Sequence, residues 1–181
     1  MEQAKPFISR GRFERGATLS EILVVLAIVA LVLMLSLTYA IGWIGRAECR
    51  GGVYSMQSFL QRARMEAVAR NRACRFTVDT ATRKMRVIDL VDVSSSSDDL
   101  LLADTTLSPK LSFARPDSGA AVTLDSISGT TYGATFASDG SLSAGAGVVS
   151  LLGGAGYLRV SLYGAGGTVV ERWDGASWVA P

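Results

Sequence analysis

The sequence predicts an α+β protein in which one long N-terminal helix packs against an antiparallel β-sheet head. Three observations support this prediction. An almost unbroken apolar run lies close to the N-terminus, a helical apolar stripe follows it, and the second half alternates short β-type segments with glycine-rich turns. At 181 residues the chain is long enough for one ordinary domain plus an appendage.

The apolar run is long enough to cross a membrane. It covers residues 22–44, with only three small or polar residues interposed after Leu35. As a helix these 23 residues would measure about 34 Å, against about 30 Å for a bilayer core. The basic residues of segment 1–16 predict a cytoplasmic N-terminus and an extracytoplasmic position for everything after the run.

The formal charge of +2 conceals an uneven distribution of basic and acidic residues along the chain. Segment 1–16 accounts for the whole excess. Residues 46–86 hold ten basic side chains against three acidic ones, whereas residues 87–181 hold four basic against ten acidic. The sequence therefore predicts a basic helical region and an acidic head.

The apolar run could also be a secretory signal peptide or an ordinary signal anchor. A secretory signal peptide would have a shorter apolar region, of about 7–15 residues, followed by a small-residue cleavage site. The candidate site at Ala40 lies inside the apolar pattern. An ordinary signal anchor fits length and flanking charge equally well, so the boundary sequence has to distinguish them.

That boundary reads Arg15-Gly16-Ala17-Thr18-Leu19-Ser20-Glu21. It resembles the class III signal of type IV pilins and pseudopilins, in which a short basic leader ends in glycine, and threonine, leucine and glutamate follow at fixed positions. The resemblance implies that a prepilin peptidase cuts between Gly16 and Ala17 and methylates the new amino terminus. Ala17 departs from the usual phenylalanine, and Thr38 stands where major pilins commonly carry a helix-kinking proline.

Glu21 also has a physical reason to take part in assembly. A carboxylate at the mouth of a membrane helix costs on the order of 3 kcal/mol at depth, and less near the interface, so it needs a partner. Cleavage would give Ala17 a free ammonium group, and a neighbouring subunit shifted along a filament could bring that charge to Glu21. The local alternative is a capping box formed by Thr18 and Glu21. Both interactions are possible, the capping box before assembly and the pair with the ammonium group of a neighbour after it.

After residue 44 the chain becomes polar but keeps a helical apolar spacing. The stripe consists of Val53, Met56, Leu60, Ala63 and Ala67. It predicts an amphipathic continuation of the helix that lies against the head and stops near Asn71. Segment 58–72 resembles the signature of the GspH/FimT branch of pseudopilins, a Leu-x-x-Ala-Arg-x-Glu-Ala helix end that leads into the first strand. Gly51-Gly52 departs from it and predicts a flexible point.

A basic cluster surrounds the predicted end of the helix and consists of Arg62, Arg64, Arg70, Arg72 and Arg75. One interpretation is contact with nucleic acid, because some members of this branch resemble DNA-uptake receptors that bind DNA near the C-terminus. Here the corresponding segment, 164–173, offers only Arg172 beside Glu171, and the acidic head would repel phosphate. We therefore favour a solvated helix face that meets acidic partners along a filament.

The head is expected to be built from short strands. We predict strands over residues 75–80, 84–91, 105–113, 121–127, 131–136, 147–152, 157–163 and 168–173, with the first two forming a hairpin. Residues 93–99, which include four serines, predict a loop, and 136–140 resembles the Phe-x-x-x-Gly turn of the same branch. Trp173, Trp178 and Val179 either close the sheet or form a contact patch, and we favour closure.

Few residues could carry chemistry. The chain has no histidine, which removes the commonest general base and metal ligand. Asp98, Asp99 and Asp104 could bind calcium, but we favour a flexible acidic loop. Cys49 and Cys74 would be roughly 37 Å apart on an unbroken helix, so a disulfide requires a break between them, most simply at Gly51-Gly52. We expect no cofactor, no metal and no enzymatic activity.

The four expected segments are a cleaved leader over 1–16, a transmembrane and filament-core helix over 17–44, an amphipathic continuation over 45–72 and a β-rich head over 73–181. The predicted function is structural: a minor subunit of a type II secretion pseudopilus or a type IV pilus, held in the inner membrane with a periplasmic head. Its predicted partners are other pilin or pseudopilin subunits, the prepilin peptidase and the membrane. The alternatives are a DNA-binding minor pilin of a competence pilus and a plain signal-anchored protein.

Overall fold

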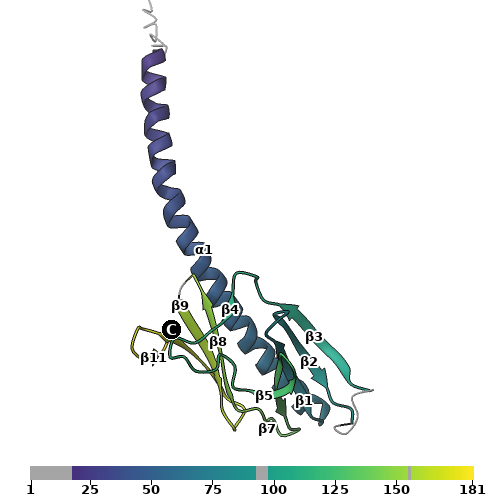
Figure 1. The fold of residues 1–181 in the computed structure, drawn as a ribbon. Helices are drawn as coiled ribbons and strands as arrows, with labels where there is room; N and C mark the ends of the chain where they lie inside the picture. Colours follow the sequence, from purple (N-terminus) through teal and green to yellow (C-terminus); the bar gives the residue numbers. More distant parts are fainter. Residues whose placement is uncertain (1–17, 93–97, 155) are drawn as a thin grey trace, which may run out of the picture. The chain divides into compact units, whose positions relative to one another are not determined.

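The computed structural model describes residues 18–92, 98–154 and 156–181. By Cα proximity the chain divides into two compact units, one ending at Ala40 and the other running from Ile41 to Pro181. Helix α1, Leu19–Arg70, contributes to both units, and the strands all belong to the second (Figure 1).

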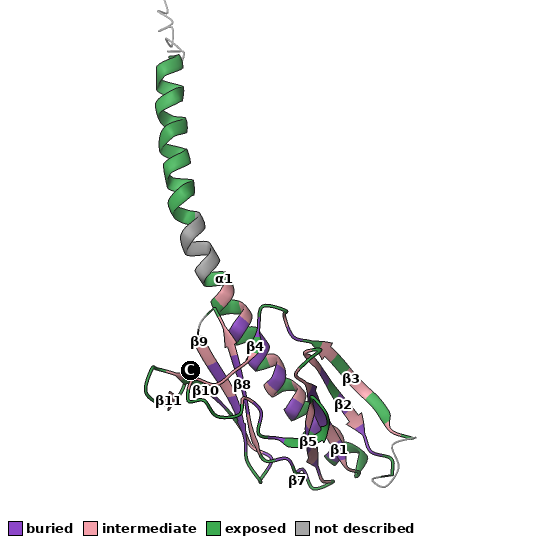
Figure 2. Ribbon diagram, in the orientation of Figure 1, coloured by how far each residue is buried: buried purple, intermediate pink, exposed green. Residues whose placement is uncertain are grey.

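The described part of the first unit is an apolar helix. Residues Leu19–Ser36 have a mean hydropathy of 2.7, and none of this stretch is buried. Figure 2 shows it exposed on every side. It is the one helix in the described residues that is long and apolar enough to span a membrane. A helix that is apolar all round needs lipid or protein as its surroundings.

In the second unit α1 buries the predicted stripe. Val53, Met56, Leu60, Ala63 and Ala67 are all buried, and they join one hydrophobic core with residues from both sheets. The largest of the buried side chains are Phe76 and Phe136. The stripe was therefore correctly predicted, because i, i+3 and i+4 spacing places these side chains on one face.

The helix ends near Asn71, as predicted, in a Schellman motif. Asn71 has a φ of 52°, the left-handed conformation that asparagine tolerates better than most residues. The Arg72 amide donates to the carbonyl of Ala67 at 3.1 Å, and the Asn71 amide donates to that of Val68 at 3.2 Å. These two bonds satisfy carbonyls that would otherwise lack partners at the helix end.

The described strands form two antiparallel sheets. The six-stranded sheet has the order β3-β2-β1-β6-β5, and β7 also pairs with β6; the five-stranded sheet has the order β11-β10-β9-β8-β4. The strands are β1 Cys74–Asp79, β2 Lys84–Asp89, β3 Leu100–Thr106, β4 Ser112–Phe113, β5 Asp125–Ser128, β6 Thr131–Phe136, β7 Leu142–Ala144, β8 Gly147–Gly153, β9 Gly156–Leu162, β10 Thr168–Trp173 and β11 Trp178–Val179.

The strand predictions were mostly right, with two clear errors. The first hairpin forms as β1 and β2, and β6 and β10 have the predicted bounds. The single strand predicted over 105–113 is wrong, because β3 starts at Leu100 and the chain turns after Thr106. Pro109 lies in this turn and cannot donate to a ladder. Of the strand predicted over 121–127, only the last three residues belong to β5.

Two short strands, β7 and β11, were not predicted. In β11, Trp178 pairs with Trp173 of β10, and their rings meet edge to face with centroids 5.4 Å apart. These tryptophans therefore close the sheet, as favoured from the sequence. The predicted loop over 93–99 lies mostly outside the described residues.

Close approach between the helix and the head depends on glycine. A Cβ on Gly52 would lie 2.4 Å from Cδ1 of Leu111, and one on Gly154 would lie 2.8 Å from Cα of Gly45. Gly51, by contrast, faces open space. The helix runs through both residues without a break.

Candidate functional site

The start of α1 forms the capping box that the sequence allowed. The Glu21 amide donates to Oγ1 of Thr18 at 3.3 Å, and the Thr18 amide donates to Oε2 of Glu21 at 3.3 Å. This reciprocal pair satisfies two amides that have no partner inside the helix. Leu19 follows as the first helical residue and is 81% exposed. Gly16 and Ala17, the predicted processing residues, lie outside the described residues.

The carboxylate of Glu21 lies at the edge of an apolar groove. A groove of about 210 Å³ is lined by Glu21, Ile22, Val25 and Leu26, all on the same face of α1. The lining residues are exposed, so the groove is open to a neighbour. An apolar surface that ends in one carboxylate is suited to a second apolar helix that offers a cation there.

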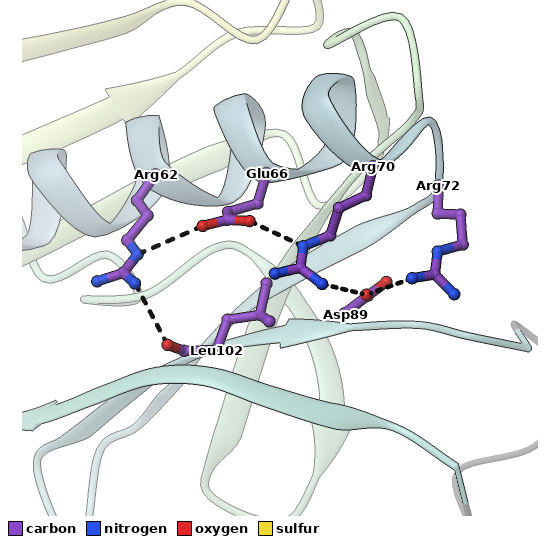
Figure 3. Close-up of polar contacts among 6 residues, drawn as sticks. All are labelled: Arg62, Glu66, Arg70, Arg72, Asp89 and Leu102. Atoms are coloured by element: carbon purple, nitrogen blue, oxygen red, sulfur yellow. Dashed lines mark hydrogen bonds and ion pairs between the residues drawn. The ribbon is translucent and has the colours of Figure 1, made fainter.

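Three of the five predicted arginines form one ion-pair network at the other end of α1. Figure 3 shows Glu66 between Arg62 and Arg70, and Asp89 of β2 between Arg70 and Arg72. Arg70 Nε donates to Glu66 at 2.8 Å, while Nη1 of Arg70 and Nη2 of Arg72 reach Oδ2 of Asp89 at 3.3 and 3.0 Å. The hydrogen bond from Arg70 to Glu66 raises the pKa of the guanidinium.

Asp89 is the structural centre of this network. Its side chain is fully buried, whereas those of Arg70 and Arg72 are 35% and 42% exposed. A buried carboxylate is tolerated only when it is paired, and here two guanidiniums from the end of the helix supply the pairing. The network therefore fastens the end of α1 to the six-stranded sheet. Sequence reasoning did not find Asp89, because its partner set exists only after folding.

The other two arginines point elsewhere. Arg64 Nη1 donates to the carbonyl of Gly166 at 3.4 Å, in the turn between β9 and β10. Arg75 Nε donates to Oγ1 of Thr135 at 3.1 Å, between β1 and β6. The structure therefore separates the predicted basic cluster into three places, and each arginine has a partner within the head. This arrangement does not provide a single basic surface for nucleic acid.

A second charged cluster lies on the five-stranded sheet. Arg159 Nε and Nη2 donate to the two oxygens of Glu171 at 2.8 and 3.1 Å, and Ser161 Oγ is 2.6 Å from Glu171. The bond from Arg159 lowers the pKa of Glu171. The Arg159 guanidinium also lies 4.3 Å above the Trp178 ring, a cation–π geometry. This cluster joins β9, β10 and β11, and we assign it a structural role.

The remaining candidates for chemistry also have structural surroundings. Within the described ranges no three His, Cys, Asp or Glu side chains gather as a metal site. Asp104 pairs with Lys84 at 3.0 Å. Cys49 and Cys74 are buried free thiols. Burial raises the pKa of both, that of Cys74 to about 11, which keeps the thiols protonated and unreactive.

The long helix, with one apolar exposed half and a β-sheet head packed on the other half, has the arrangement expected of a pilin-like fold. A family model, the type II transport protein GspH, matches residues 53–166. The match covers more than half of the sequence, so the chain belongs to this GspH family of type II transport proteins.

Two solved structures are similar to the chain. The type IV minor pilin FimU of Pseudomonas aeruginosa (strain PAO1) is 16% identical with a TM-score of 0.49, covering 70% of this chain and 90% of its own. The minor pseudopilin EpsH of the type 2 secretion system of Vibrio cholerae is 18% identical with a TM-score of 0.44, covering 65% and 93% respectively. No curated protein matches the sequence significantly.

Proposed function

We propose that the chain is made as a precursor, that a prepilin peptidase removes residues 1–16, and that the mature subunit enters a filament through its N-terminal helix. Before assembly the apolar helix anchors the subunit in the inner membrane, with the N-terminus on the cytoplasmic side and the head in the periplasm. The subunit plays a structural and non-enzymatic part.

One observation supports this proposal above the others. From Leu19 to Ser36 the helix has a mean hydropathy of 2.7 with none of it buried, and its single carboxylate, Glu21, is at the groove described above. In the membrane, lipid covers these side chains. On leaving the membrane they need another protein surface, which neighbouring subunits of the same class supply.

Glu21 gives the packing its register. The hydrogen bond that the Thr18 amide donates to the Glu21 carboxylate is long, at 3.3 Å, so the carboxylate can exchange it for a stronger charge-assisted bond. The new ammonium group of a neighbouring subunit would provide that bond. Such a pair in an apolar interface favours the one stagger that forms it and penalises those that leave the carboxylate unpaired.

The first experiment is the intact mass and N-terminal sequence of the protein from its native membrane. We expect the chain to begin at Ala17, with the mass increment of a methyl group. A plain signal anchor would instead keep Met1, and that result would overturn the proposed processing.

The second experiment measures incorporation. Glu21→Ala should reduce the amount of the subunit that co-purifies with sheared filaments, whereas the neighbouring Ser20→Ala should leave it unchanged. Both positions are exposed on the first turn of α1, so the pair isolates the carboxylate. Equal incorporation of the two variants would contradict the assembly role of Glu21.

A further inference from the structure

A second apolar groove lies on the head, along the exposed face of the last turns of α1. It has a volume of about 510 Å³ and is lined by Gln61, Arg64, Met65, Val68 and Ala69. Met65 is 63% exposed and Val68 is 52% exposed. These residues face away from the buried stripe, so the fold of the head gives no reason for apolar side chains here.

The groove has two different flanks. On one flank the turns that contain Gly140 and Gly166 approach the helix so closely that a Cβ on Gly140 would lie 3.0 Å from Cγ2 of Val68 and 3.2 Å from Nε of Arg64. Arg64 extends along this flank to Gly166. On the other flank stands the row of Arg62, Glu66 and Arg70. The apolar floor thus lies open to solvent, with arginines on both sides of it.

The electrostatic balance of the flanks is positive. Arg62, Arg64 and Arg70 outnumber the two exposed or partly exposed acids, Glu66 and Asp139 of the turn that contains Gly140, and the side chain of Arg62 is 47% exposed against 26% for Glu66. Asp89, the other acid of the network, is fully buried. The groove therefore presents apolar side chains in the middle and guanidinium donors at its edges.

This combination selects among possible occupants. Double-stranded nucleic acid would meet the arginines with phosphate but would leave Met65 and Val68 without an apolar partner. A uniformly apolar helix would cover the floor but offer no carboxylate to the exposed parts of Arg62 and Arg64, whose present partners are Glu66 and the carbonyl of Gly166. The floor from residue 61 to 69 extends along roughly 12 Å, about two helical turns. A helix with an apolar stripe and acidic flanks satisfies both requirements.

We propose that this groove binds an acidic amphipathic helix of a partner protein in the same assembly. The apolar stripe of the partner lies on Met65, Val68 and Ala69, and its carboxylates pair with Arg62 and Arg64. That the partner belongs to the assembly rests on the proposed function. The groove itself lies wholly within the head and does not involve the N-terminal helix.

The test is a fluorescence anisotropy titration of the full chain, in non-ionic detergent, with two labelled synthetic helices. Both peptides carry the same Leu/Ala stripe, which is flanked by glutamate in one and by lysine in the other. We expect the acidic peptide to bind at least about tenfold more tightly, with an affinity that falls as salt is raised. Equal binding of the two peptides would overturn the proposal.

Two matched variants distinguish binding of the peptide to the groove from its binding to the detergent micelle. Met65→Glu should lower the affinity for the acidic peptide by about tenfold or more, because it places a carboxylate on the floor of the groove. Tyr54→Glu makes the same kind of change three turns earlier on the same face, at a position that is 50% exposed, and should have no effect. Equal effects of the two variants, or displacement of the peptide by duplex DNA, would contradict the proposed occupant.

The titration needs no filament, so its failure is distinct from a failure of the proposed function. Intact binding with undisturbed incorporation of Glu21→Ala would contradict the assembly role alone. Loss of peptide specificity with normal processing at Gly16 would contradict the groove proposal alone.

Discussion

Gly51 and Gly52 are neighbours in α1 but have opposite surroundings. A Cβ on Gly51 meets nothing within 4 Å, whereas one on Gly52 meets Leu111 at 2.4 Å. Leu111 is only 2% exposed and has little room to move. The same substitution at the two positions therefore separates helix propensity from packing.

We predict that Gly51→Ala raises the free energy of unfolding by about 1 kcal/mol, the helix propensity of alanine over glycine. At Gly52 the same gain is offset by overpacking, which costs roughly 1–3 kcal/mol, so Gly52→Ala should be neutral or destabilising. Denaturant unfolding of the two variants measures the difference. A more stable Gly52→Ala would show that Leu111 moves freely and would contradict the tight packing described here.

At the scale of elements, the end of α1 and strand β2 are joined by charge. Arg70 and Arg72 share one oxygen of Asp89, which is fully buried. Either guanidinium can serve the carboxylate when the other is absent. The two arginines should therefore be coupled in their effect on stability.

We predict that Arg70→Met and Arg72→Met each cost at most about 1 kcal/mol, because both guanidiniums are partly exposed and one remains to pair Asp89. The double variant leaves a buried carboxylate without a counter-ion and should cost about 3 kcal/mol or more. A double-mutant cycle of unfolding free energies checks the coupling. Arg62→Met, which leaves no buried charge, is the control, and simple additivity would contradict the shared role.

At the scale of the whole molecule, the free energy of unfolding should depend on pH in both the acidic and the alkaline range. Hydrogen bonds from Thr82, Thr130 and the Ala81 amide lower the pKa of Asp79 from 3.8 to about 2. The bonds from Ala81 and Thr82 lie within the β1–β2 turn, and the bond from Thr130 joins that turn to the β5–β6 turn. The pKa values of four further carboxylates are also lowered by hydrogen bonds: Asp117, Asp139, Glu171 and Asp174.

We predict that the unfolding free energy falls as pH decreases from about 4 to about 2. A lowered pKa means that the unfolded chain takes up protons first, so the contribution of Asp79 is present above 3.8 and is lost through about 2. The raised pKa of Cys74 has the opposite sign, so its contribution is present below 9.0 and is lost as pH rises through about 11. Denaturant unfolding measured across pH tests the contributions of Asp79 and Cys74. In Asp79→Asn the unfolding free energy should fall less steeply as the pH becomes acidic. An unchanged acid limb in that variant would contradict the role of Asp79.

Much of the fold could be predicted because its signals are local. The apolar run, the stripe from Val53 to Ala67 and the helix stop at Asn71 each depend on residue types at fixed spacing. The boundary from Gly16 to Glu21 likewise needed no tertiary structure to indicate a pilin-like precursor. The turn at Pro109 was missed because an apolar and β-branched stretch on either side of it resembles one continuous strand.

The sequence by itself determined the class of protein, because a membrane-length apolar helix, its capping box and its charge polarity are properties of neighbouring residues. Only the tertiary structure decided what the arginines do. Five basic side chains close together in the sequence face three different parts of the head, because a helix turns by about 100° per residue and the strand after it reverses direction. Burial of Asp89, the exposure of Met65 and Val68, and the need for glycine at position 52 arise from contacts between distant segments, which no local pattern records.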